Sequence, residues 1–315
     1  MRMAALCRVL VKRHRITLWI PPDARQIMKE NLPQSTCFRL PCIKTIYRDY
    51  AIDNLATLRH NFRIFVCSSS FVSRLGRKFQ RMGVDVVISD YEPLTARAAG
   101  RARIPVLHVS HQRAINGHAA VRPSWFKARV VNAFMMRNAR NCITSSFYDG
   151  DVGPLLRSEI TSLTPTRGDF VFVYARDAFR EYVVPALAEF PRTKFRVFPS
   201  AEPGFAASLA ACRGIIAPAG HQLMSEALQL KKPLLVFPQK GQYEQQLNAR
   251  MLVRSGWGMI GQLSKITKSI RTFMELVDRF PLHEPDPRVR YCLHDDTERA
   301  AALVEEWMGK LAVGV

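Results

Sequence analysis

Short apolar runs alternate with longer helical patterns along most of this chain, and this alternation restricts the possible folds more than any other feature. The strand-like runs occupy residues 15–20, 84–89, 104–109, 169–175, 193–199, 214–218 and 233–238. The helical stretches occupy residues 2–12, 54–82, 93–102, 177–190, 204–212, 221–230 and 243–256. Nearly continuous apolar strands between helices are typical of a parallel sheet covered on both faces. The pattern predicts an α/β fold of Rossmann-like, doubly wound units.

Two such units fit the length of 315 residues. Residues 149–168 are rich in Gly, Pro, Ser and Thr and have no clear period, which indicates a linker. We therefore expect one domain over residues 1–150 and a second over residues 151–315. Open α/β sheets bind ligands beyond the carboxyl ends of their strands, so the site should line a cleft between the two domains.

Positive charge is concentrated in the first half. The chain has 46 basic and 26 acidic residues, a formal net charge of +20. Residues 1–150 hold 25 basic and 8 acidic residues, whereas residues 151–315 hold 21 and 18. The first half should meet an anionic partner, such as phosphate or acidic lipid, unless an arginine-rich genome raises basic counts everywhere. No recognised nucleic-acid motif accompanies the charge, so we expect no nucleic-acid partner.

Composition also restricts location and metal chemistry. No apolar run approaches the roughly 20 residues of a membrane-spanning helix, and the basic amino terminus lacks the cleavage site of a signal peptide. We expect a cytoplasmic protein. The seven cysteines are scattered without a CxxC pair, which disfavours both a disulfide framework and a zinc site.

The strongest local signal follows residues 214–218. Gly220 directly precedes a helical stretch, so free backbone N–H groups and the positive end of a helix dipole would face the cleft, as phosphate binding requires. Glu226, about a turn and a half into that stretch, could accept hydrogen bonds from two ribose hydroxyls. The alternative is an ordinary helix that starts at a glycine and carries a solvated glutamate.

A second polar group follows residues 233–238. Residues 239–249 place side chains that both donate and accept hydrogen bonds at the start of a helix, which suits a polyhydroxylated ligand such as a sugar. An ordinary polar helix start would have the same composition.

The order GH, SEAL, KPLLVFP and EQQLNA across residues 220–249 resembles the donor-binding half of GT-B nucleotide-sugar glycosyltransferases. It is most similar to the group of UDP-glucuronosyltransferase-like proteins and the lipid-acceptor N-acetylglucosaminyltransferase of peptidoglycan synthesis, and the resemblance covers residues 1–258. It implies two domains facing across a cleft, without cofactor or tightly bound metal. By resemblance, Gly220, His221 and Gln222 hold the donor diphosphate, Glu226 the ribose, and Glu244 and Gln245 the sugar hydroxyls, with Asn248 in support. Arg176 would supply a countercharge to the diphosphate, or else lie on the surface.

Catalytic candidates come from the first half. Asp90 ends a strand-like run and could act with Glu92 as a carboxylate pair, although an acidic residue there is also a common helix cap. His111 lies just past residues 104–109 and is a better cleft candidate than His108, which falls within that run and reads as a core histidine. His118 also falls near the cleft. We take Asp90 and His111 as the catalytic pair.

The amino terminus departs from the family pattern. Family members begin with a strand and a loop of the type Gly-His-x-x-Arg, whereas this chain begins with residues that resemble those after that histidine. Either the start codon was assigned too far downstream, or the protein is shortened. Loss of a central strand would expose two sheet edges and lower the stability of the first half of the chain.

An aromatic-basic segment is a candidate for acceptor binding. Trp125 and Phe126 lie among basic residues and could rest on an anionic membrane, or could pack into the core of the first domain. The basic residues are Arg113, Arg122, Lys127 and Arg129.

These observations predict a glycosyltransferase that moves a sugar from a nucleotide diphosphate to a hydroxyl acceptor. The expected nucleotide is UDP, and the acceptor could be lipid-linked. We expect peripheral association at the inner face of the plasma membrane. One alternative is a catalytically impaired nucleotide-sugar-binding or membrane-associated protein. The other is a nucleotide-sugar 2-epimerase, which would have an acidic pair where this chain has His221 and Gln222.

Overall fold

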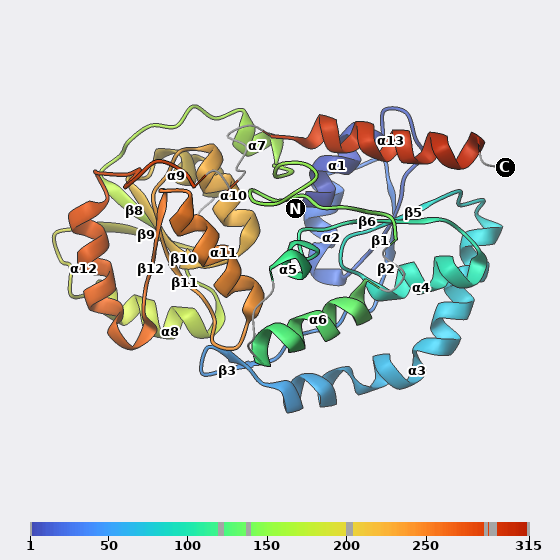
Figure 1. The fold of residues 1–315 in the computed structure, drawn as a ribbon, viewed down its shortest axis with the longest axis horizontal. Helices are drawn as coiled ribbons and strands as arrows, with labels where there is room; N and C mark the ends of the chain where they lie inside the picture. Colours follow the sequence, from blue (N-terminus) through green and yellow to red (C-terminus); the bar gives the residue numbers. More distant parts are fainter. Residues whose placement is uncertain are drawn as a thin grey trace.

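The computed structural model describes residues 2–118, 123–136, 140–199, 204–286, 289 and 295–313. Two α/β lobes lie side by side (Figure 1), with the second half of the chain forming the lobe at the left of the view. The predicted α/β class with parallel sheets is confirmed.

The second lobe is built on a single parallel sheet with strand order β12-β11-β10-β8-β9. Its strands are β8 (Phe170–Tyr174), β9 (Lys194–Phe198), β10 (Gly214–Pro218), β11 (Leu234–Phe237) and β12 (Gly258–Ile260). Its helices are α8 (Asp177–Leu187), α9 (Phe205–Ala211), α10 (His221–Gln229), α11 (Tyr243–Arg254) and α12 (Ile266–Leu276), with a 3-10 turn, η2 (Leu263–Lys265). Val171 and Val173 of β8 pack toward α8 and α12, whereas Phe170 and Phe172 pack toward α9, α10 and α11. Because both faces are covered, the strands read as continuous apolar runs.

The sheet of the first lobe is divided. Its strands are β1 (Thr17–Ile20), β2 (Thr36–Arg39), β5 (Val87–Ser89), β6 (Val106–Val109) and β7 (Cys142–Ile143). β1 pairs with β2, and β5, β6 and β7 form a separate parallel sheet in that order. Within the described residues, one edge of β1 and one edge of β5 therefore have no strand partner. These are the two open edges expected of a sheet without a central strand.

Helices cover both pieces of this sheet. They are α1 (Arg2–Leu10), α2 (Arg25–Asn31), α3 (Asn54–Arg81), α4 (Pro93–Ala102), α5 (Ala114–Gly117) and α6 (Pro123–Met135), with a 3-10 turn, η1 (Pro22–Ala24). A short helix, α7 (Ser158–Thr161), lies in the expected linker. Helix starts follow local chemistry, because Asp53 caps α3 by accepting a hydrogen bond from the backbone N–H of Ala56 at 2.9 Å.

The last helix returns to the first lobe. In α13 (Thr297–Val313), Ala300 and Val304 pack against Leu6 and Leu10 of α1, and Figure 1 shows α13 running along the first lobe. The expected boundary near residue 150 therefore separates the sheets, while the end of the chain packs with the first lobe.

A small hairpin joins the lobes. It consists of β3 (Tyr47–Arg48) and β4 (Ala51–Ile52), and its buried Tyr50 packs against Phe179 of the second lobe. The Tyr50 hydroxyl donates a hydrogen bond to the carbonyl of Phe237 at 2.6 Å. This contact holds the carboxyl end of β11, which leads into the loop before α11.

Candidate functional site

The carboxyl ends of four strands, two from each lobe, bring predicted site residues together. Asp90 follows β5 and His111 follows β6 in the first lobe. In the second lobe, His221 opens α10 after β10, and Glu244 lies in the first turn of α11 after β11. We call these four residues and Arg2 of α1 the interlobe cluster, because contacts link all five.

Arg2 lies between the two predicted catalytic residues. Its Nη2 donates to Oδ1 of Asp90 at 2.8 Å and its Nε donates to Oδ2 at 3.3 Å, a bidentate ion pair. Its Nη1 lies 3.4 Å from Nδ1 of His111. Asp90 and His111 are therefore brought together, but through the guanidinium of Arg2 rather than by direct contact.

His111 contacts the second lobe with both its edge and its face. Its Nε2 lies 3.1 Å from Oε1 of Glu244. Its ring stacks on His221 with centroids 4.1 Å apart. Burial opposes ionisation of Glu244, but the electrostatic and hydrogen-bonding effects of His111 and the positive charge of Arg2 outweigh it and lower the pKa of that carboxyl. Glu244 is therefore an anion at neutral pH.

His221 is held in a buried, uncharged state. Its Nε2 lies 3.2 Å from Oγ of Ser146, and its other face stacks on Phe147 at 5.1 Å between centroids. Burial, followed by the electrostatic effects of His111 and of the Arg2 guanidinium, holds the pKa of His221 well below its usual value. The imidazole is neutral at pH 7, so this side chain can pack against His111 without charge repulsion.

The start of α10 is open. Gly220 is its N-cap residue, no side chain caps the helix, and a Cβ built on Gly220 would meet no atom within 4 Å. Asn248 supports the preceding turn, since its Nδ2 donates to the carbonyl of Ala219 at 3.2 Å and its Oδ1 accepts from the Tyr148 hydroxyl at 2.5 Å. A rigid helix amino terminus with free N–H groups beside open space is a ready anion site.

Glu226 lies on the same helix but is buried in an ion pair. Arg157, near the middle of the linker, donates from Nε to Oε1 at 2.9 Å and from Nη2 to Oε2 at 2.8 Å. Gln222 adds a bond from its Nε2 to Oε1 at 3.1 Å. The carboxylate is only 2% exposed, so the expected free carboxylate facing the cleft is instead one held by Arg157.

Two other predicted donor residues lie apart from the interlobe cluster. Gln245 closes its own loop, with Oε1 accepting from the backbone N–H of Gln239 at 3.0 Å and Nε2 donating to its side-chain Oε1 at 3.1 Å. Arg176 is exposed, immediately before α8, with its guanidinium carbon 5.9 Å from the ring centre of Tyr174. Neither side chain contacts the cluster residues.

Three first-lobe residues take structural positions. Glu92 caps α4 by accepting from the backbone N–H groups of Leu94 and Thr95 at 2.9 and 2.7 Å, so it forms no carboxylate pair with Asp90. His108 is fully buried within β6, as expected of a core histidine. His118 pairs with Asp149 at 2.7 Å. The described residues contain no group of side chains suited to a metal ion.

Arg2 and Arg157 are site residues that the sequence did not single out. Each pairs with a carboxylate far along the chain, which leaves no local pattern. Ser146 and Tyr148 come from an irregular segment after β7 and carry no motif.

Comparisons with known proteins agree with this architecture. The family model described as glycosyl transferase family 1 matches residues 1–202 and 192–278. No curated protein matches the sequence.

Several solved structures share the fold. UGT2 of Phytolacca americana, complexed with UDP-2-fluoro-glucose and pterostilbene, is 16% identical with a TM-score of 0.63, over 98% of this chain and 95% of that one. The calicheamicin glycosyltransferase CalG4 is 16% identical with a TM-score of 0.62, over 98% and 95%. MurG of Acinetobacter baumannii is 15% identical with a TM-score of 0.56, over 97% and 95%. The expected GT-B architecture is thereby confirmed.

The buried neutral His221 predicts a pH dependence of stability. Its folded pKa is lowered, so below about pH 6.5 the unfolded state binds a proton that the folded state does not, and stability falls as the pH falls. Between pH 7 and pH 5, His221→Gln should flatten the slope of unfolding free energy by up to about 1.4 kcal/mol per pH unit. Urea unfolding at several pH values measures both slopes. Parallel curves for the two proteins would contradict a neutral His221.

Proposed function

The chain belongs to glycosyl transferase family 1 and is an enzyme that transfers a sugar, and from this premise we propose that its donor is a UDP-sugar and its acceptor a hydroxyl group. The observation that carries the proposal is the open amino terminus of α10 beside the interlobe cluster. A diphosphate at Gly220 would receive backbone N–H groups and the positive end of the helix dipole. The UDP-sugar analogue named for the Phytolacca structure supports this choice of donor.

The ribose would lie next to Glu226. Each oxygen of this carboxylate already accepts a bond from Arg157, but a carboxylate has about four acceptor sites and can take further donors. The bond from Gln222 is the longest of the three to Glu226, so it is the one that a ribose hydroxyl would replace. Arg157 would then keep the Glu226 carboxylate ionised and oriented toward the ribose. Arg176 remains a proposed countercharge that would have to swing toward the diphosphate.

His111 would be the general base. The acceptor hydroxyl would give its proton to Nδ1, where the contact from Arg2 is long at 3.4 Å and can be displaced. The acceptor oxygen would bond to the anomeric carbon as the bond from that carbon to the diphosphate oxygen breaks. The anionic Glu244 beside Nε2 would stabilise the imidazolium that forms.

The other cluster residues would position the reactants. Asp90 would hold Arg2 beside the base through its bidentate pair. Glu244 has a second oxygen that does not face His111 and would accept a bond from a sugar hydroxyl, as the resemblance implies. Gln245 and Asn248 would act through the loops that they brace.

The acceptor side would rest on a membrane. Leu55, Leu58 and Phe62 of α3 and Phe126, Val130 and Val131 of α6 are all between 42% and 67% exposed, and we call these six residues the apolar patch. Lys127 of α6 hydrogen-bonds Asn54 of α3, which joins the two helices. Exposed Arg59 and Arg129 lie on the same helices. Trp125 packs against the hydrophobic core, as the alternative interpretation of this segment expected, whereas the exposed Phe126, Val130 and Val131 favour membrane contact by the other face of α6. Arg122 lies outside the described residues.

No described helix is long and apolar enough to cross a bilayer. Any membrane contact through the apolar patch would therefore be peripheral, and an acidic leaflet would attract the basic first half of the chain. A lipid-linked hydroxyl acceptor would be presented from that surface.

Replacing Gly220 tests the diphosphate site. Gly220→Asp puts a negative charge into the open space and should weaken UDP binding at least about tenfold through like-charge repulsion. Gly220→Asn is the matched control, because it has the same shape and caps the helix equally well without charge. Isothermal titration with UDP measures both affinities. Equal affinities for the two variants would place the diphosphate elsewhere.

Replacing His111 tests the base. His111→Gln should lower kcat by about 10²- to 10⁴-fold while UDP affinity changes little, because the donor is held by the other lobe. His14→Gln is a control, since His14 pairs with Glu305 away from the cluster. Steady-state assays with UDP-sugars and titration with UDP separate the two effects. An unchanged kcat would remove His111 from the chemistry.

Polar substitution tests the apolar patch. The double variant Phe126→Ser and Val130→Ser should reduce co-sedimentation with vesicles of phosphatidylcholine and phosphatidylglycerol by at least about thirtyfold, since full burial of each side chain contributes roughly 1.5 to 3 kcal/mol. Val184→Ser, on an exposed site of α8 in the second lobe, controls for general loss of apolar surface. If both proteins sediment like the parent, the membrane proposal fails.

A further inference from the structure

Helix α6 buries an amide at a position where an apolar side chain would be expected. Asn132 is 3% exposed, whereas its neighbours Val130 and Val131 are exposed. Burial of a primary amide is unfavourable unless both its oxygen and its nitrogen find hydrogen-bond partners. The partners of Asn132 therefore explain why α6 carries an amide at this position.

Both polar atoms of the Asn132 side chain are bonded, and each partner directly follows a predicted catalytic residue. Its Oδ1 accepts from the hydroxyl of Tyr91 at 2.7 Å, and its Nδ2 donates to the carbonyl of Gln112 at 2.9 Å. Tyr91 comes immediately after Asp90, and Gln112 comes immediately after His111. One side chain of α6 thus holds the loop after β5 and the loop after β6.

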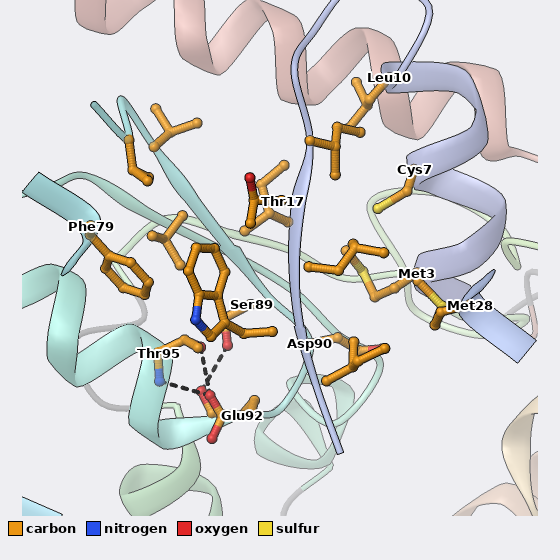
Figure 2. Close-up of a pocket in the computed structure, with 18 of the residues that line it drawn as sticks. Met3, Cys7, Leu10, Thr17, Met28, Phe79, Ser89, Asp90, Glu92 and Thr95 are labelled. Carbon is orange, nitrogen blue, oxygen red and sulfur yellow. Dashed lines mark hydrogen bonds between the residues drawn. The ribbon is translucent and has the colours of Figure 1, made fainter. Parts of the chain in front are cut away.

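The loop after β5 has a backbone conformation that must be held by its surroundings. Tyr91 has a φ of 52°, in the left-handed region, which is unfavourable for a bulky side chain. Figure 2 shows this end of β5, with Glu92 bonded to Thr95 and with Asp90 lying apart from both. The bond from the Tyr91 hydroxyl to Asn132 therefore helps to hold the turn from which Asp90 projects.

The loop after β6 is held on both sides of His111. The carbonyl of Gln112 accepts from Asn132 and also from the backbone N–H of Ile115 at 3.1 Å. The backbone N–H of Gln112 donates to Oγ of Ser110 at 3.3 Å, and the Ser110 hydroxyl donates to the Gln112 side chain. Because His111 lies between Ser110 and Gln112, these bonds fix the backbone that carries its imidazole.

Arg2 joins the same two loops through their side chains. Its guanidinium pairs with Asp90 at 2.8 Å and lies 3.4 Å from Nδ1 of His111. A guanidinium is rigid and planar, so it can reach both groups only over a narrow range of loop spacings. Asn132 sets that spacing from α6, since its short amide bonds one residue of each loop.

We infer that Asn132 is a positioning residue that holds Asp90 and His111 at the spacing that sugar transfer requires. The inference rests on the proposed function, in which His111 is the base and Asp90 holds Arg2 beside it. Asn132 is buried in the first lobe, whereas the diphosphate site is at α10 of the second lobe. Loss of the Asn132 amide should therefore lower kcat and leave UDP binding unchanged.

Two variants separate positioning from stability. Leucine has the branched shape of asparagine without its polar atoms, so Asn132→Leu removes both bonds and leaves the Tyr91 hydroxyl without its acceptor. The urea midpoint should fall in this variant. Combining Asn132→Leu with Tyr91→Phe also removes the orphaned hydroxyl, so most of the lost midpoint should return, because an apolar pair replaces a polar pair. Neither variant restores the hold on the two loops.

Nuclear magnetic resonance of the full chain, with isotopically labelled histidine, reports the position of His111 without any substrate. The ring signals of His111, assigned with His111→Gln, should move in both variants, whereas those of His14, which pairs with Glu305, should stay in place. In both variants, kcat for UDP release from UDP-glucose or UDP-N-acetylglucosamine should fall at least about tenfold, because the base is misplaced. The dissociation constant for UDP should stay within about twofold of the parent value, because the donor lobe is intact.

The inference is overturned if the double variant returns the His111 signals to their parent positions together with the urea midpoint, since Asn132 would then act on stability alone. It is also overturned if Asn132→Leu leaves those signals unchanged, or if kcat stays at the parent value in both variants while His111→Gln lowers it. Failure of the proposed function gives a different result. An unchanged kcat in His111→Gln would remove the base from the chemistry, and the His111 signals would still show whether Asn132 holds that side chain.

Discussion

The stack of His111 on His221, with Glu244 and Arg2 at the edges of His111, is the contact on which the arrangement of the site depends. One imidazole comes from each lobe. Arg2, His111, His221 and Glu244 can share this space only if their charges are divided. Burial, followed by the effects of His111 and Arg2, keeps His221 neutral, while His111 and Arg2 favour the ionised form of Glu244. The electrostatics of the cluster thus require both lobes to be in place.

A second contact ties the donor helix to the connection between the lobes. Arg157 reaches from the middle of the linker to the buried carboxylate of Glu226, and breaking this pair would leave an uncompensated charge. Tyr50 makes a third tie from the first lobe to the carboxyl end of β11. Opening the space between the lobes would disturb the same groups that we assign to donor binding. Substrate binding and lobe position are therefore coupled through shared side chains.

The sequence predicted what depends on local pattern. The strand-like run at 233–238 and the helical stretch at 54–82 reappear as β11 and α3, because period and apolar content reflect burial directly. The sequence also placed Asp90, His111, His221 and Glu244 near the cleft between the lobes, since open parallel sheets carry their sites at the carboxyl ends of the strands, but it did not predict their mutual contacts.

The choice of partner for each charge could not be predicted. The sequence does not show which basic residue pairs with the carboxylate of Glu226. Arg157 reaches it only because of the path that the linker takes. Glu92 shows the same limit, because capping of α4 and pairing with Asp90 were equally compatible with the sequence. The solvent-facing apolar residues of α6 were ambiguous for a further reason. Their exposure depends on α6 burying Asn132, which bonds Tyr91 and the carbonyl of Gln112, instead of its valines.

The divided sheet explains why the amino-terminal and carboxyl-terminal helices matter to the site. Within the described residues, no strand lies between β1 and β5. The position of α1 is set by α13, whose Ala300 and Val304 pack against Leu6 and Leu10 of α1. Arg2 stands at the start of that helix, so its distance to His111 is set by how α1 packs against α13 and against Leu18 of β1. The position of α1 therefore connects the packing of the first lobe to the order of the interlobe cluster.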